Sequence, residues 1–185
     1  MPKYKKKIKI ERVFALPNKW TFKIKPIMKL IKKEMADTKP WIDPFAGMNS
    51  PAHIRNDINP DMPAEYHLDA LEFVKMFDDE SIAGILFDPP YSFHQAGVTY
   101  NTDVKALTKT YRSDIKQQMC RILRPNGKAI SFGWNSNGIS SSQNKQFRVV
   151  RFQTMEKTRF LLVAHGAGHN DTIVTVERKI QETLI

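Results

Sequence analysis

The feature that most constrains the fold is the stretch Ile85-Leu86-Phe87-Asp88-Pro89-Pro90-Tyr91. Three apolar residues are typical of the end of a buried strand, and two prolines cannot continue a central ladder because they lack the N–H donor. The strand is therefore predicted to end at Asp88. Because ligands bind at the carboxyl edge of the strands in open α/β sheets, we expect Asp88 and Tyr91 to lie in a binding site.

The four residues from Asp88 to Tyr91 offer a specific chemistry. The carboxylate of Asp88 and the carbonyl of Pro89 are adjacent acceptors, which together can hold both hydrogens of an exocyclic amino group. The ring of Tyr91 can stack on a flat heterocycle. The alternative is an ordinary turn after a strand, because Asp-Pro and Pro-Pro are common turn dipeptides. A second motif is needed to decide between the two interpretations.

Three further aspartates follow predicted strands, namely Asp43, Asp57 and Asp69. In one parallel sheet they would line up with Asp88 along a single edge. Gly47 follows Asp43 closely and permits a tight turn and the close approach of a ligand. Asp57 is placed to accept hydrogen bonds from ribose hydroxyls, and Asp69 could accept one from an adenine amino group.

The order of the predicted elements indicates the fold class. Strands and helices alternate through the first two thirds of the chain, and strands crowd the last third. This order predicts an α/β fold with a mostly parallel central sheet that ends in an antiparallel strand pair. Helices are expected at residues 26–35, 71–77 and 105–123, loops at 13–20, 92–104 and 135–144, and strands at 41–43, 53–57, 66–69, 82–87, 128–134, 147–152, 158–165 and 172–178.

Length and composition favour one globular domain. A chain of 185 residues with 41% hydrophobic content can build one core but not two sizeable ones. We predict a single domain over residues 13–185 after a basic tail at residues 1–12, which could also form a lysine-guarded edge strand. The chain has no apolar run of about 18 residues that would span a membrane and no secretory signal, and a single cysteine fits a reducing, cytoplasmic compartment. The five histidines show no metal-ligand spacing with this cysteine, so no metal is expected.

The positive charge is concentrated at the start of the chain. Residues 1–39 carry 13 Lys and Arg against three Asp and Glu, whereas residues 40–185 carry 16 of each. Such a segment favours a polyanionic partner, most often nucleic acid, although it could also be a solvated tail that aids solubility. The expected phosphate contacts are Lys3, Lys5, Lys6, Lys7 and Lys9.

The segment Asp43-Pro44-Phe45-Ala46-Gly47, taken with Asp88-Pro89-Pro90-Tyr91, resembles the amino-methylating DNA methyltransferases that use S-adenosylmethionine. The resemblance covers roughly residues 18–135 and implies the class I, Rossmann-like methyltransferase fold. The Asp-Pro-Pro-Tyr form of the catalytic motif implies methylation of adenine N6 more often than of cytosine N4.

The resemblance also implies roles for individual residues. The target base would leave the stack, Asp88 and the Pro89 carbonyl would hold its amino group, and Tyr91 would stack on its ring. Phe93, in the loop that follows, would contact the nucleic acid. The implied catalytic residues are Asp88, Pro89, Pro90 and Tyr91, and the implied cofactor-binding residues are Phe22, Pro26, Asp43, Phe45, Ala46, Gly47, Asp57, Ile58, Asp69 and Ala70.

The sequence departs from the family pattern in two places. Asn49 stands where the family usually has a second glycine, and only nine residues separate Gly47 from Asp57, so the usual helix is expected to shrink to a turn at residues 49–51. The chain also has no room for a target-recognition domain. Besides adenine-N6 methylation of DNA, cytosine-N4 methylation, methylation of structured RNA and a catalytically inactive cofactor-binding protein stay open, as does a homodimeric state.

Two smaller sets of residues have open roles. Cys120 lies in the long predicted helix and is expected in the core, where a thiol is usually inert. Trp134, Asn135 and Asn137 follow a predicted strand. They either line a pocket for the base or serve as a core Trp and turn-forming Asn residues.

Overall fold

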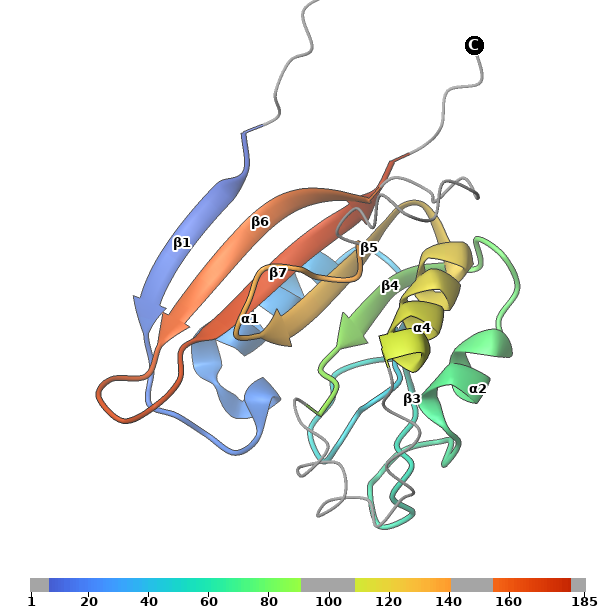
Figure 1. The fold of residues 1–185 in the computed structure, drawn as a ribbon, viewed down its shortest axis with the longest axis horizontal. Coiled ribbons are helices and arrows are strands. Elements are labelled where there is room, and N and C mark those ends of the chain that lie inside the picture. The colour runs from blue at the N-terminus through green and yellow to red at the C-terminus, as the bar shows by residue number, and fades with distance from the viewer. Residues whose placement is uncertain (1–6, 91–108, 141–154, 181–185) are drawn as a thin grey trace, which may run out of the picture.

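The computed structural model describes residues 7–90, 109–140 and 155–180, and within them a seven-stranded sheet runs through the molecule in the order β1-β6-β7-β5-β4-β2-β3 (Figure 1). The strands are β1 (Lys9–Phe14), β2 (Trp41–Asp43), β3 (Ile54–Arg55), β4 (Ile82–Phe87), β5 (Leu123–Gly133), β6 (Met155–Ala164) and β7 (Thr172–Lys179). The helices are the 3-10 turn η1 (Thr21–Lys23), α1 (Lys25–Met35), α2 (Ala70–Lys75) and α4 (Lys109–Ile122).

The direction of the strands confirms the predicted sheet. β7 is antiparallel to both β5 and β6, and the other neighbouring strands are parallel. The carboxyl ends of all strands except β7 therefore meet at one edge, which is the lower edge of the sheet in Figure 1. A ligand site of this fold is expected at that edge.

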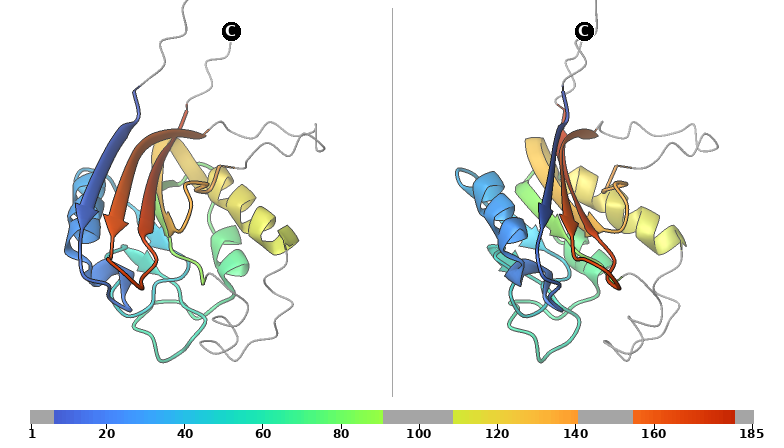
Figure 2. Two further views of the ribbon diagram at one scale, coloured as in Figure 1. Left: turned by 60° about the vertical axis from the view of Figure 1, so that its left-hand side comes forward. Right: turned by 90° about the vertical axis from the view of Figure 1, so that its left-hand side faces the viewer.

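Helices cover both faces of the sheet (Figure 2). α1 packs on one face and buries Ile27 and Ile31, while α2 and α4 pack on the other and bury Phe73 and Met119. Within each helix the buried residues lie on one side, as Ile27 and Ile31 of α1 do at a spacing of four, so each helix presents one apolar stripe to the sheet. Cys120 belongs to the second core and is buried, and burial raises the pKa of its thiol to about 12. The prediction that Cys120 lies in the core is confirmed.

The region between β2 and α2 differs from its prediction, and β3 covers only residues 54–55 of the strand predicted at 53–57. The connection from β2 to β3 runs through turns and has no helix, as expected. However, the strand predicted at residues 66–69 does not form, since Tyr66 makes only an isolated bridge with Asn56. Asp69 instead caps α2 by accepting hydrogen bonds from the N–H groups of Leu71 and Glu72. An aspartate at this position satisfies helix donors that would otherwise lack partners.

The last third of the chain follows its prediction, and three of the strand ends extend beyond their predicted bounds. β5 begins at Leu123, directly after α4, and so includes the segment that was predicted only to stop the helix. β6 begins at Met155, three residues earlier than predicted, and β7 ends at Lys179. The strand predicted at residues 147–152 lies outside the described residues, as do residues 105–108 of the long helix and the predicted loop at 92–104.

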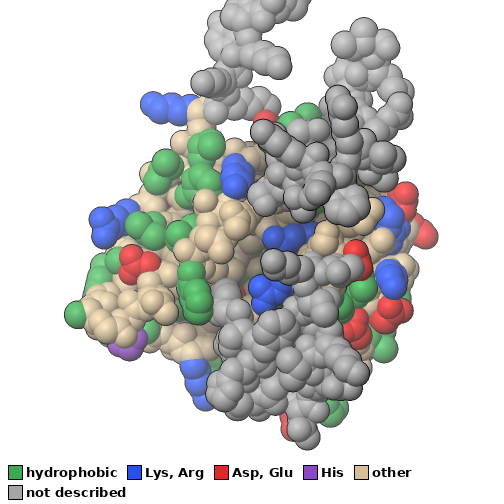
Figure 3. Space-filling view, viewed as in Figure 1, with side chains coloured by type: hydrophobic (Ala, Val, Ile, Leu, Met, Phe, Trp, Pro, Cys, Tyr) green, Lys and Arg blue, Asp and Glu red, His purple; other side chains and the backbone are tan. Residues whose placement is uncertain are grey.

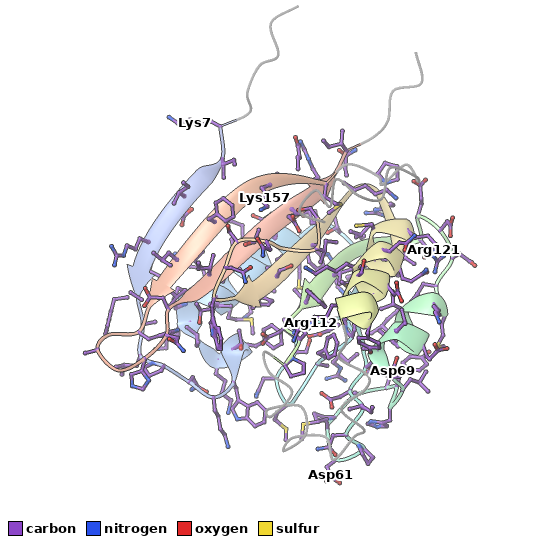
Figure 4. All side chains as sticks on the ribbon, viewed as in Figure 1. Lys7, Asp61, Asp69, Arg112, Arg121 and Lys157 are labelled. Carbon is purple, nitrogen blue, oxygen red and sulfur yellow. The ribbon has the colours of Figure 1, made fainter. Side chains whose placement is uncertain are left out.

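Residues 9–12 belong to the sheet, because β1 pairs in parallel with β6 as an edge strand. Of the two interpretations of this segment, the structure supports the lysine-guarded edge strand for residues 9–12. Lys7 precedes the start of β1 at the edge opposite the carboxyl ends of the parallel strands (Figure 4). Lys3, Lys5 and Lys6 lie outside the described residues. No helix in the described parts of the chain is both long and apolar enough to cross a membrane.

A glycine in β4 makes room for the largest side chain of the core. Trp41 in β2 is fully buried, and its register partner in β4 is Gly84. A Cβ atom on Gly84 would lie 2.3 Å from the indole ring. We expect Gly84→Ala to lower the free energy of unfolding by about 1–3 kcal/mol, as is usual for overpacked cores, measured by urea denaturation.

A double variant tests the cause of this loss. Trp41→Leu removes the ring that the new methyl group meets, so adding Gly84→Ala to Trp41→Leu should cost less than half of its cost in the wild type. Equal costs in both backgrounds would show that the alanine acts through the strand backbone and not through Trp41.

Candidate active site

A cleft of about 490 Å³ opens at the carboxyl edge of the sheet. Segments far apart in the sequence form its wall, as expected for a site at the edge of a parallel sheet. The segment before α1 contributes residues 17–22 and 24, the turn after β2 contributes residues 45–49, and the end of β4 contributes residues 88–90. Trp134 after β5, residues 165, 169 and 170 between β6 and β7, and Thr172 at the start of β7 complete it.

Asp43 builds the turn after β2 and does not itself line this cleft. Its side chain is fully buried, where Oδ1 accepts a hydrogen bond from Phe45 N–H at 3.0 Å and Oδ2 accepts one from Ser50 Oγ at 2.6 Å. Burial raises the pKa of Asp43 to about 7, and the negative charges of Asp88 and Asp57 act in the same direction. Asp43 therefore positions the turn and can change its charge near neutral pH.

Asp57 also acts on the cleft through the backbone. It is buried, and its carboxylate accepts hydrogen bonds from Gly47 N–H at 2.8 Å and from Asn59 N–H at 3.0 Å. Gly47 has a φ of +52°, a conformation that glycine adopts at little cost. Asp57 was predicted to accept ribose hydroxyls; here each of its oxygens accepts one backbone N–H group, so it positions the glycine turn. It is not among the residues that line the cleft.

The remaining residues predicted to bind the cofactor divide into two groups. Phe22, Phe45, Ala46 and Gly47 line the cleft. The other group is not among the residues that line it: Pro26 is in the first turn of α1, Ile58 is exposed, Ala70 is in the core of α2, and Asp69 caps α2.

Asp69 also accepts a hydrogen bond from Tyr111 Oη of α4 at 2.8 Å. Burial and this bond raise the pKa of Tyr111 above its ordinary value. The carboxylate predicted to bind an adenine amino group thus joins two helices. Of the four predicted acids, Asp88 is the one that the described residues place in the cleft wall.

The end of β4 lies where the sequence predicts it. The strand ends at Phe87, and Asp88, Pro89 and Pro90 follow in the cleft wall. The ring of Phe45 meets the ring of Phe87 edge-on at a centroid distance of 5.9 Å, which joins the turn after β2 to the end of β4. Tyr91 and Phe93 lie outside the described residues.

A second cleft, of about 240 Å³, lies beside the first and shares Pro89, Pro90 and Trp134 with it. Asn135 and Asn137 also line it, and Trp134 is exposed and not part of the core. Asn135 in addition forms a turn, because its Oδ1 accepts a hydrogen bond from Asn137 N–H at 3.0 Å, so both interpretations hold for the asparagines. The rest of its wall comes from Phe87, from residues 131–133 of β5, from Gly138, and from Arg112 and Lys116 of α4.

A buried carboxylate holds the loop that forms one side of this second cleft. Glu177 of β7 is fully buried and accepts hydrogen bonds from Ile139 N–H at 2.6 Å and from the N–H and hydroxyl groups of Ser140. Gly138 has a φ of +63°, and a Cβ atom there would lie 2.2 Å from the Glu177 carboxylate, so glycine is required. Sequence reasoning missed Glu177, although a charged residue within a β-branched strand was the available signal.

The loop between β6 and β7 is a second feature that sequence reasoning missed. His165 is buried, with Nδ1 at 2.8 Å from Ala15 O and Nε2 at 3.0 Å from Thr172 Oγ1. It thereby joins the end of β1 to the start of β7, and His169 and Asn170 of the same loop line the first cleft. These residues lie far along the chain from the motifs at Asp43 and Asp88, and no spacing pattern marked them.

Neither protein family models nor curated protein sequences match this chain. Solved structures do match its fold. The N-methyltransferase NodS from Bradyrhizobium japonicum WM9 has a TM-score of 0.54 and 9% identity, over 83% of this chain and 94% of that one. A 1,6-didemethyltoxoflavin-N1-methyltransferase from Burkholderia thailandensis, solved with 1,6-didemethyltoxoflavin and S-adenosylhomocysteine bound, has a TM-score of 0.51 and 12% identity, over 84% and 77% of the two chains. The chain thus has the class I, Rossmann-like fold of S-adenosylmethionine-dependent methyltransferases that its sequence predicts.

Proposed function

We propose that this protein is an S-adenosylmethionine-dependent methyltransferase that methylates the N6 amino group of adenine in DNA. The observation that carries the proposal is the position of the end of β4. Pro89 and Pro90 line both clefts, and Asp88 lines the first. A methyl donor in the first cleft and an acceptor base in the second would therefore meet at Asp88-Pro89-Pro90.

The residues of the first cleft fit the cofactor. Its volume lies within the range of roughly 300–1,000 Å³ that small-molecule sites usually have. Asn49 Nδ2 in its wall is buried and has no hydrogen-bond partner among the described residues, so the carboxylate of an amino-acid moiety could satisfy it. Gly47 lacks a side chain where the backbone must approach a ligand closely. We assign the methionine part to this turn, with Phe22 and Trp20 as its apolar wall.

The acceptor chemistry follows from two neighbouring oxygens. When bound, the cofactor supplies an electrophilic methyl group. Asp88 and the Pro89 carbonyl accept the two hydrogens of the target amino group, which directs the lone pair of its nitrogen toward the first cleft. Tyr91 follows Pro90 directly in the sequence and is proposed to stack on the flipped base. The described residues contain no cluster of His, Cys, Asp or Glu that could hold a metal, and direct transfer uses none.

The decisive experiment identifies the methylated product. The purified protein is incubated with methyl-labelled S-adenosylmethionine and, in parallel, with unmethylated DNA and with structured RNA, and each product is digested to nucleosides. We expect label in N6-methyldeoxyadenosine. Label in N4-methylcytosine or in an RNA nucleoside would overturn the choice of base or of nucleic acid. Cofactor binding without any transfer would indicate a protein that binds nucleic acid and has lost catalysis.

We expect Asp57→Ala to weaken cofactor binding by about tenfold or more, because hydrogen bonds to a charged group contribute about 1.5–3 kcal/mol each. The loss arises through Gly47, whose N–H group Asp57 holds in the turn. Calorimetry with S-adenosylhomocysteine measures it, and DNA affinity should fall less than cofactor affinity does.

Asp61→Ala is the matched control for this variant, because Asp61 is an exposed carboxylate on the same connection (Figure 4). Its cofactor affinity should equal that of the wild type. If Asp57→Ala, checked for folding by thermal unfolding, binds the cofactor as tightly as Asp61→Ala does, then the turn does not depend on Asp57.

A further inference from the structure

Two cations of α4 line the second cleft and form no ion pair with any acidic side chain that the structure describes. Arg112 and Lys116 are four residues apart, so both side chains lie on the same face of the helix, and both contribute to the wall of this cleft. None of the ion pairs among the described residues involves either of them. The nearby carboxylate of Glu177 is buried and holds Ile139 and Ser140.

A third cation, Lys157 of β6, approaches the same loop. Lys116 donates a hydrogen bond from Nζ to the carbonyl of Gly138 at 2.7 Å, and Lys157 donates one to the carbonyl of Ser136. Burial lowers the pKa of Lys116, and the positive charges of Arg112 and Lys157 lower it further, although Glu177 opposes them. Positive charge is thus concentrated beside the second cleft, where an anion would be attracted.

Figure 4 labels two of these cations. They are Arg112 and Lys157, and Figure 3, from the same side, shows separate Lys and Arg side chains across this face, a few of them near its centre. Lys7 lies at the upper edge of the molecule in that view, before the first residue of β1. A six-residue strand spans about 20 Å, so the start of β1 is well separated from the edge that carries Asp88.

We propose that Arg112 and Lys116 bind the phosphate group of the DNA strand next to the target nucleotide. The planar guanidinium of Arg112 can contact two phosphate oxygens at once, whereas the ammonium of Lys116 acts as a point charge and also fixes the loop at Gly138. This contact rests on the proposed function. It assigns the second cleft to a nucleotide within a DNA strand and not to a free base. Lys7 and Lys9, at the start of β1, then contribute to general attraction at a distance from the target.

The experiment measures DNA affinity against salt. Fluorescence anisotropy follows a labelled mixed-sequence duplex of about 24 base pairs, with saturating S-adenosylhomocysteine, from about 50 to about 250 mM NaCl. We expect Arg112→Gln to weaken binding by roughly three- to tenfold and to reduce the slope of log affinity against log salt by about 0.9. Lys116→Gln should act in the same direction, and Arg112→Lys should keep most of the slope.

Lys29→Gln is the matched control, because it removes one exposed positive charge from α1 on the opposite face of the sheet. It should leave both affinity and slope unchanged. Equal slopes for the wild type and Arg112→Gln, or an equal loss in Lys29→Gln, would overturn the proposed contact even if methylation of DNA is demonstrated. A reduced slope in Arg112→Gln but not in Lys29→Gln supports the proposed phosphate contact. This holds even if the protein transfers no methyl group, because the absence of transfer would overturn only the proposed function.

Discussion

Asp88→Ala is expected to lower the rate of methyl transfer, kcat, by at least about a hundredfold, which corresponds to about 2.7 kcal/mol of activation free energy. Asp88 is the acid that the described residues place in the first cleft, directly after the end of β4. Without its carboxylate the amino group of the base keeps one acceptor, the Pro89 carbonyl, and loses the orientation that directs its lone pair at the methyl group. Single-turnover kinetics with saturating cofactor and DNA measure the effect.

Folding and cofactor binding should survive this change. Asp88 is half-buried at a strand end and lies outside both hydrophobic cores, so removing its side chain opens no cavity. Asp88→Asn is the stricter variant, because the amide keeps the shape and one acceptor oxygen but loses the charge. It should be slower than the wild type and faster than Asp88→Ala. Activity of Asp88→Ala within about tenfold of the wild type, or about 1.4 kcal/mol, would rule out the assigned role.

The central part of the fold was predictable because its signals are local. The Asp-Pro-Pro segment stops β4 at Phe87, since two consecutive residues without N–H groups cannot extend a central strand. The alternation of helices and strands, followed by crowded strands, predicted a mostly parallel sheet with an antiparallel pair at its end. The connection between Gly47 and Asp57 was too short for a helix, and none formed.

The roles of the other acids were less predictable, because one residue type satisfies several local needs. An aspartate after a strand can contact a ligand, cap a helix or hold a turn, and the sequence around it looks similar in each case. Asp69 became a helix cap, and Asp57 and Asp43 became supports for the turn after β2. Which role an aspartate takes depends on which N–H groups the fold leaves without partners nearby.

The second cleft could not be predicted from neighbouring residues in the sequence. Its cations come from α4, its loop follows β5, and the carboxylate that holds this loop comes from β7. Each of these residues looks ordinary within its own segment, since lysines on a helix usually only solvate an outer face. The sheet order, with β7 next to β5, is what brings Glu177 to Gly138 and Ser140.

The second large effect concerns Asp43 and pH. Because burial raises its pKa from 3.8 to about 7, the folded protein keeps a proton on Asp43 that the unfolded chain releases. The contribution of this group to stability is therefore undiminished below about pH 4 and falls as the pH rises toward about 7, above which it stays constant. At about 1.36 kcal/mol per pH unit, the loss is of the order of 4 kcal/mol.

Asp43→Asn isolates this term from the other titrating groups. The amide oxygen can still accept from Phe45 N–H, and its NH₂ group can donate to Ser50 Oγ, so the turn keeps its partners without the charge. Carboxylates such as Glu65, whose pKa is lowered by its hydrogen bond from Arg55, stabilise the fold as the pH rises and do so equally in both proteins. The difference between wild type and variant thus reports Asp43.

Urea denaturation followed by Trp fluorescence at about pH 4.5 and about pH 8 provides the measurement. We expect Asp43→Asn to have nearly the stability of the wild type at the lower pH and to exceed it by about 2–4 kcal/mol at the higher pH. Asp43→Ala leaves Phe45 N–H and Ser50 without their acceptor, so it should lose stability relative to Asp43→Asn at both pH values. An advantage of Asp43→Asn that does not grow with pH would mean that Asp43 is already ionised in the folded protein. The turn would then hold a buried negative charge beside Asp88 at every pH tested.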